Sequence, residues 1–186
     1  MDNSNNKDFK SAIIVAVPEE LNTQIQDLRK LYDKAFVRWM PHINLIFPFV
    51  KIEDFDNKFT ELQKVIGTFK PFKLVYRDFG YFQHGKSCVV WLRPETPEDP
   101  TILTRIQSAL EGALPGFNEL STKSEAGFQP HLTVGQFGGL KQTTDKIESF
   151  KKTFKAIEFT VSEIYMIHRD GDVPFTIRHC LKLNGN

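Results

Sequence analysis

The feature that most constrains the fold of this chain is a five-residue phrase that occurs twice, at residues 41–45 (PHINL) and 130–134 (PHLTV). Each copy reads proline, histidine, aliphatic residue, small hydrogen-bonding residue, aliphatic residue. In an extended strand every second side chain points to the same face, so the histidine and the hydrogen-bonding residue share a face. These pairs are His42 with Asn44 in the first copy, and His131 with Thr133 in the second.

The elements predicted around the two phrases follow the same order, which favours a duplicated fold. Each phrase is a strand that follows a strand and a helix and precedes another helix and strand. The first unit covers about residues 11–79 and the second about 87–168. The predicted helices lie at 18–32, 53–68, 99–113 and 144–154; the other predicted strands lie at 13–17, 72–79, 88–92, 157–168 and 175–183, with a hairpin turn at 83–86 and a loop at 115–128.

This order predicts the α+β class and a bilobal, pseudo-two-fold arrangement in one domain, residues 10–186. Each lobe is expected to hold an antiparallel-containing sheet and two helices, with the active site in the cleft between the lobes. No linker rich in proline, glycine or serine separates the units, so the lobes should pack together. Residues 1–9 are polar and are expected to form a flexible leader.

The charge balance argues against a protein that coats nucleic acid. The 186 residues contain 24 Lys and Arg against 23 Asp and Glu, a formal net charge of +1. Displacing counterions along a phosphate backbone needs a marked basic excess. A nucleotide or a single RNA 3′ end could still occupy a local pocket.

Nothing in the sequence suggests export or a membrane. Cys88 and Cys180 lie far apart without metal-ligand spacing, which is typical of reduced thiols in a cytosolic protein. The longest aliphatic run, residues 12–17, is too short to cross a bilayer. We therefore expect a monomer in the cytoplasm, with the nucleus left open.

Two histidines in matched phrases point to acid–base chemistry, because a symmetric pair supplies both an acid and a base near neutral pH. A single strand histidine is more often structural, and we expect that of His179. His84 should be solvated, and His168, at a strand end, could either reach a substrate or form a surface ion pair. Zinc needs three or four ligands, and no acidic residue lies near either phrase, so a metal site is not predicted. Serine-hydrolase and phosphate-loop motifs do not occur in the sequence.

Most of the 17 phenylalanines fall on apolar stripes and should pack in the core. Four aromatic residues near strand ends are better candidates for stacking on a nucleobase: Trp39, Phe47, Phe49 and Tyr81.

The two phrases and their surroundings resemble the two-histidine phosphoesterase superfamily, in its branch of 2′-5′ RNA ligase-like and cyclic-nucleotide phosphodiesterase proteins. The similarity rests on residues 39–49 (WMPHINLIFPF) and 129–135 (QPHLTVG), and extends to the element order of nearly the whole chain. The resemblance implies metal-independent cleavage of RNA-type phosphodiesters, without a cofactor. The implied substrates are 2′,3′-cyclic phosphates, ADP-ribose cyclic phosphate, 2′,5′-linked oligoadenylates and RNA 3′ ends.

The resemblance also implies site residues: His42 and His131 as the catalytic pair, and Asn44 and Thr133 as donors to phosphate oxygens. By position it makes Phe47 a base-stacking residue. Strand alternation places Phe47 on the face opposite His42, so this role requires the strand to bend near Pro48.

Two departures from the family pattern stand out. Asn44 replaces the common hydroxyl residue, although an amide can still donate to a phosphate oxygen. Gln129 and Gln136 occupy places where several relatives carry a basic residue.

The sequence thus predicts a phosphodiesterase, and the resemblance adds reversible joining of RNA ends to the activities to be tested. A nucleotide- or RNA-end-binding module without catalysis is the alternative, and a purely structural or protein-interaction domain is a third interpretation. The sequence leaves open which histidine is the base.

Overall fold

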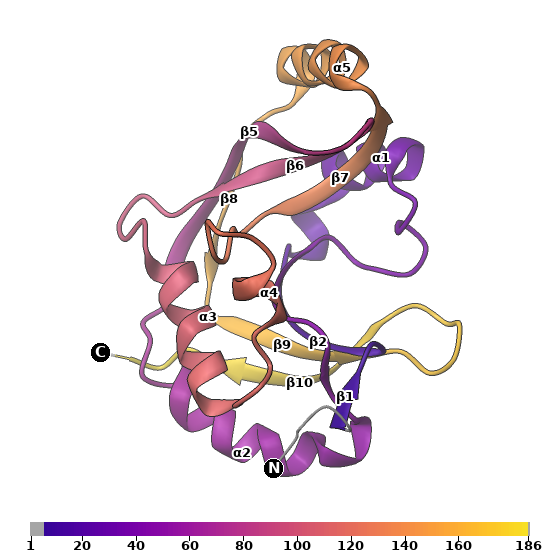
Figure 1. The fold of residues 1–186 in the computed structure, drawn as a ribbon. Helices are drawn as coiled ribbons and strands as arrows, with labels where there is room; N and C mark the ends of the chain where they lie inside the picture. Colours follow the sequence, from indigo (N-terminus) through magenta and orange to yellow (C-terminus); the bar gives the residue numbers. More distant parts are fainter. Residues whose placement is uncertain (1–5, 186) are drawn as a thin grey trace.

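The computed structural model describes residues 6–185, and two four-stranded antiparallel sheets dominate it (Figure 1). In the first sheet the strands lie in the order β10-β9-β2-β3, and in the second the order is β7-β6-β5-β8. The strands of the first sheet are β2 (Ser11–Ala16), β3 (His42–Ile46), β9 (Glu163–His168) and β10 (Thr176–Lys182); those of the second are β5 (Phe72–His84), β6 (Ser87–Glu95), β7 (Leu132–Gly138) and β8 (Ile157–Val161).

The helices cover the sheets, and all but the shortest bury apolar side chains. They are α1 (Thr23–Tyr32), α2 (Phe55–Ile66), α3 (Ile102–Ala113), the short α4 (Glu119–Thr122) and α5 (Leu140–Thr153), with 3₁₀ turns at Glu19–Leu21 and Ile52–Asp54. In α2, for example, Phe55, Leu62 and Ile66 are buried, which are positions that share one face of a helix. In Figure 1, α5 lies above the second sheet, whereas α2 and α3 lie with the first sheet below.

The α+β class and the bilobal arrangement are confirmed, but the sequence units 11–79 and 87–168 do not each form one lobe. Strand β5 of the first unit joins the second sheet, and β9 of the second unit joins the first sheet. Helices cross as well, because α1 packs on β7 and α3 packs on β3. Strand β5 joins the second sheet because a short hairpin connects it to β6, and strands joined by a short turn pair with each other. The turn contains Gly85, which has a φ of +60°.

The segment expected as one strand at 157–168 is two strands, β8 and β9, that belong to different sheets. The buried positions change phase at the break: Ile157 and Val161 are odd-numbered, whereas Ile164 and Met166 are even-numbered. Since a one-residue shift turns every side chain to the other face, a single straight strand could not bury both sets. Ser162, between the two strands, is the point at which the chain passes from the second sheet to the first.

Two further expectations need correction. The loop expected at 115–128 contains the helix α4. Part of the expected flexible leader is a short strand, β1 (Lys7–Asp8), which pairs with β4 (Phe49–Val50). Residues 1–5 of that leader lie outside the described residues.

Candidate active site

Strand β3 begins at His42 and presents it as the alternation predicts. Ile43 and Leu45 are completely buried in the core, while His42 and Asn44 on the opposite face are partly exposed. The second phrase has the same pattern, with Leu132 and Val134 completely buried. His131, immediately before β7, and Thr133 are partly exposed.

Both histidine strands are edge strands of their sheets, and the two edges meet. Strand β3 ends the first sheet and β7 ends the second. Cα atoms of β3 and β7 lie within 8 Å of one another. The fold therefore brings together two phrases that lie some 90 residues apart in sequence.

The two imidazoles are held by the same hydrogen bond. Nδ1 of His42 lies 2.6 Å from the carbonyl oxygen of Met40, and Nδ1 of His131 lies 2.8 Å from that of Gln129. A carbonyl can only accept, so in each neutral ring Nδ1 carries the proton and Nε2 is unprotonated. Each histidine thus offers Nε2 as its reactive atom.

His42 is enclosed more fully than this shared anchor requires. The indole of Trp39 stacks on its ring, with centroids 4.5 Å apart and 18° between the planes. The amide of Asn44 donates to Nε2 of His42 at 3.2 Å, and the Asn44 Oδ1 is buried without a partner among residues 6–185. The second N–H of this amide is not used by His42 and can donate elsewhere.

A buried ion pair lies behind His42. Arg29, only 1% exposed, donates from Nε to Asp33 at 2.9 Å and from a terminal nitrogen to the Trp39 carbonyl oxygen at 2.8 Å. Gln136 of β7 donates to the other oxygen of Asp33 at 3.1 Å. Gln136 therefore ties the C-terminal end of α1 to the second histidine strand.

The pKa values of both histidines fall below 6.5. Burial lowers the pKa of His42 to about 4, outweighing the Met40 hydrogen bond, and the positive charges of Arg29 and His131 lower it further. Burial also lowers the pKa of His131, with a contribution from Lys123. The effect of the His131 charge on His42 is consistent with the contact between strands β3 and β7.

Aromatic rings flank both histidines. Next to His131 lie Phe82, edge-on at 5.0 Å between centroids, and Trp91 at 6.2 Å. Sequence reasoning did not identify these two residues. Trp91 lies in the predicted strand 88–92, but only the structure shows that this strand pairs with the second histidine strand, with Trp91 opposite Thr133.

The stacking candidates differ in their positions. Phe47 packs edge-on against Trp39, with ring centroids 5.4 Å apart, and Trp39 in turn stacks on His42. Strand β3 ends at Ile46, so strand alternation no longer fixes the face on which Phe47 lies. Phe49 is completely buried against Phe55 and is a core residue, so its expected role in stacking is wrong. Tyr81 is 38% exposed.

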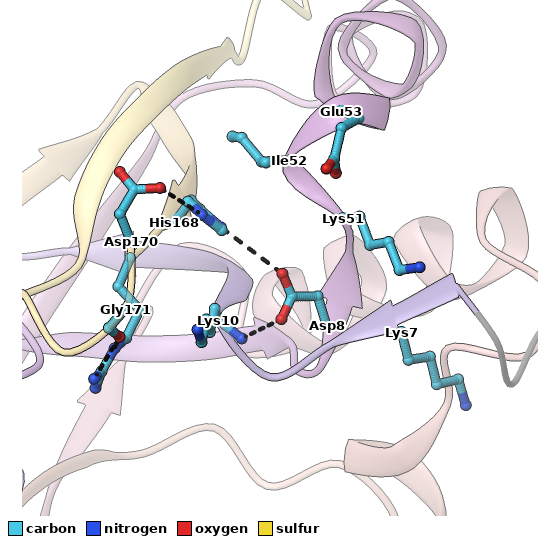
Figure 2. A pocket seen from close by; sticks show the side chains of 10 residues that line it. Lys7, Asp8, Lys10, Lys51, Ile52, Glu53, His168, Asp170 and Gly171 are labelled. Carbon is cyan, nitrogen blue, oxygen red and sulfur yellow. Dashed lines mark hydrogen bonds and ion pairs between the residues drawn. The ribbon is translucent and has the colours of Figure 1, made fainter.

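A surface cavity of about 400 Å³ lies away from the histidine pair (Figure 2). His168 lines it, with Nδ1 3.0 Å from the Ser11 hydroxyl and Nε2 3.2 Å from Asp170. This Ser–His–Asp chain is no catalytic triad, because Ser11 is completely buried and no substrate could reach it. His168 is therefore a buried structural residue that also lies 4.0 Å from Asp8.

A second cavity, about 380 Å³, is formed by β5, β6 and α5 and includes Trp91. Neither of these cavities includes His42 or His131. Within residues 6–185, no three His, Cys, Asp or Glu side chains gather in a way that could hold a metal ion. No helix in the same range is long and apolar enough to span a membrane, and both cysteines are free thiols.

Comparison with solved structures gives the same fold. Escherichia coli LigT complexed with 3′-AMP aligns with a TM-score of 0.59 at 19% identity, covering 94% of this chain and 97% of LigT. TT0787 of Thermus thermophilus aligns with a TM-score of 0.58 at 17% identity, covering 94% and 98%. At these identities the likeness establishes the architecture alone.

Sequence comparison establishes the family. A Geobacillus kaustophilus protein named "Putative phosphoesterase" is 24% identical over 178 residues, 95% of this chain and 98% of the relative. A Bacillus cereus protein of the same name is 29% identical over 129 residues, 69% and 70%. The model of the 2′-5′ RNA ligase superfamily matches residues 17–173, which include both histidine phrases. The chain therefore belongs to the 2′-5′ RNA ligase superfamily of two-histidine phosphoesterases, as the paired phrases predicted.

Proposed function

We propose that this protein is a metal-independent phosphodiesterase that cleaves RNA-type phosphodiesters with His42 and His131 as its acid–base pair. The observation that carries the proposal is the matched anchoring of the two rings. Each Nδ1 is bound to the carbonyl two residues earlier, and each ring is partly exposed on one of two adjoining edge strands. One phosphate between two such Nε2 atoms meets a base on one side and an acid on the other.

The electrostatics favour His42 as the base and His131 as the acid in the hydrolytic direction. A proton on His131 repels one on His42, and burial lowers the pKa of His42 to about 4. The singly protonated pair therefore carries its proton on His131. The phosphate anion bound between the rings would further stabilise that charge.

Hydrolysis of a 2′,3′-cyclic phosphate then proceeds in one displacement. Nε2 of His42 takes a proton from water as its oxygen attacks phosphorus. The bond to one ribose oxygen breaks, and Nε2 of His131 gives that oxygen its proton. In a 2′,5′-linked substrate, the ribose 3′ hydroxyl attacks instead and the 5′ oxygen leaves.

Asn44 and Thr133 would donate to the non-bridging oxygens, where negative charge develops. Each lies two residues after its histidine on the same strand face, and the Asn44 amide retains one N–H beyond the bond to His42. Phe47, which contacts Trp39, would support a nucleobase on the His42 side.

Related proteins support a nucleotide substrate. Structures of E. coli LigT exist in complex with 3′-AMP, ATP and phosphate. The alternative for this chain is a nucleotide-binding module without turnover. The hydrogen bond from the Asn44 amide to Nε2 of His42 favours this alternative, because it occupies the atom that would act as the base.

The test is a turnover panel in the presence of EDTA, with 2′,3′-cyclic mononucleotides, ADP-ribose 1″,2″-cyclic phosphate and 2′,5′-oligoadenylate. We expect at least one substrate to be cleaved, and the double variant His42→Ala/His131→Ala to lose that activity. His84→Ala, in the exposed β5–β6 turn, is the matched control. Loss of turnover with the chelator would exclude the proposed mechanism, and nucleotide binding without any turnover would favour the alternative.

A further inference from the structure

The cavity of about 380 Å³ next to the second sheet has a mixed aromatic and charged wall. It lies where the outer half of β5, beyond the end of β8, meets α5. Its volume falls in the range of small-molecule sites, about 300–1,000 Å³. The residues that matter are Gly80, Tyr81, Trp91, Arg93, Glu148 and Lys151.

Gly80 and Trp91 form the floor on the sheet side. A Cβ at Gly80 would lie only 2.4 Å from the Trp91 ring, so the indole rests directly on the glycine backbone. The Trp91 Nε1 is buried and has no acceptor within the described part of the chain. A buried donor without a partner is unfavourable, and an acceptor atom brought in by a ligand would satisfy it.

Two side chains of the wall are exposed. Arg93 is exposed and forms no ion pair within residues 6–185; its guanidinium lies 5.9 Å from the centroid of the Trp91 ring. Tyr81 is 38% exposed and has no aromatic contact among the same residues. By contrast, Lys151 is paired with Asp78 at 3.1 Å. An exposed ring can stack on a nucleobase, and a guanidinium without an ion-pair partner among the described residues can bind a phosphate.

The cavity adjoins the proposed active site through Trp91. This residue lines the cavity, and its ring centroid lies 6.2 Å from that of His131. Phe82 contacts both rings at 5.0 Å. Tyr81 alternates with Gly80 and Phe82, so its side chain lies on the other face of the strand. A nucleotide chain that leaves a phosphate at His131 would reach Tyr81 over the edge of β5, which has no partner strand beyond Tyr76 on the β8 side within the described residues.

We infer that this cavity is a subsite for the nucleotide that adjoins the reactive phosphate of an oligonucleotide, with Tyr81 stacking on its base and Arg93 binding its phosphate. The inference rests on the proposed function and narrows the substrate: a 2′,5′-linked oligonucleotide would use this subsite, whereas a 2′,3′-cyclic mononucleotide would not. Tyr81 and Arg93 are thus residues of substrate preference and take no part in the bond-breaking step.

The test compares the two substrates in Arg93→Ala and Tyr81→Ala. For a 2′,5′-linked triadenylate we expect KM to rise about tenfold in each variant with kcat nearly unchanged, as for the loss of one charge-assisted or stacking contact. For 2′,3′-cyclic AMP, KM and kcat should stay as in the wild type. Arg77→Ala is the control, since Arg77 lies on the same strand β5 but pairs with Glu95 at 3.0 Å outside the cavity. Equal effects on both substrates, or none on the triadenylate, would overturn the inference.

A binding measurement separates this inference from the proposed function. The chain contains two tryptophans, so Trp39→Phe leaves Trp91 as the sole indole reporter. Triadenylate should quench its fluorescence saturably, and addition of Arg93→Ala should weaken that binding about tenfold. If no substrate is turned over but this pattern holds, the subsite stands and the catalytic proposal fails. If Arg93→Ala leaves the binding unchanged, the subsite is wrong whatever the turnover.

Discussion

The two histidine segments differ far more in their surroundings than in their local geometry. Both rings are fixed through Nδ1 to the carbonyl two residues earlier. Yet His42 is stacked under Trp39 and receives the Asn44 amide, whereas His131 meets Phe82 edge-on. Only His42 has the buried Arg29–Asp33 pair behind it.

The contrast shows how a duplicated motif can acquire two roles. The backbone fixes the tautomer in the same way in both copies, so each offers the same reactive atom. Burial and neighbouring charge then decide which ring holds a proton less readily, and they favour a proton on His131. Three sets of variants test whether the two segments differ in this way.

The largest expected effect is on the two histidines themselves. His42→Ala and His131→Ala should each lower kcat about 10²–10⁴-fold, the contribution of one positioned acid or base. The wild-type pH profile of kcat/KM should be bell-shaped. Activity should fall as pH drops through about 4, where His42 becomes protonated, and as pH rises through the pKa of His131, below 6.5.

The residual profiles of the variants assign the roles. His42→Ala should lose the acidic limb and His131→Ala the basic limb. If the limbs are exchanged between the two variants, the base and acid are the reverse of our assignment. If either variant retains the wild-type rate, that histidine is not catalytic.

The second effect concerns the ion pair that only the first segment has. Asp33→Asn leaves the Arg29 charge buried without its partner, which should lower the free energy of unfolding by about 3–5 kcal/mol. Urea denaturation measures this change. Asp27→Asn is the control, because Asp27 lies exposed on the same helix and should change stability by less than about 0.5 kcal/mol. Equal stability of the two variants would show that the pair does not support the His42 segment.

The smallest effect concerns the residues two positions after the histidines. Asn44→Thr makes the first segment resemble the second and keeps a donor, so kcat should stay within about tenfold of the wild type. Asn44→Ala removes the donor and should cost about 10²–10³-fold. Thr133→Ser, which keeps its hydroxyl, is the matched control on the other strand. An Asn44→Ala variant as active as Asn44→Thr would exclude a phosphate-binding role for this amide.

The sequence was informative where the physics is local. Strand alternation correctly placed Ile43 and Leu132 in the core with their histidines on the other face, and helical periodicity located α2 and α3. The Gln83–Lys86 turn correctly predicted the β5–β6 hairpin. These features depend on neighbours within a few residues, which the sequence contains.

Predictions failed where a residue had to choose between distant partners. The phase change at Ser162 was visible, but not that β8 and β9 pair in different sheets. Phe47 and Phe49 looked alike as stacking candidates, yet one packs near Trp39 and the other is sealed in the core.

By itself, then, the sequence determined the family, the class of fold and the two histidines that share a motif, because alternation and short motifs are encoded within single strands. Only the tertiary structure decided that the strands β5 and β9 exchange sheets and that the edges β3 and β7 meet. It also decided that the two rings sit in unequal surroundings. Burial and charge are sums over groups far apart in the chain, and folding alone brings those groups together.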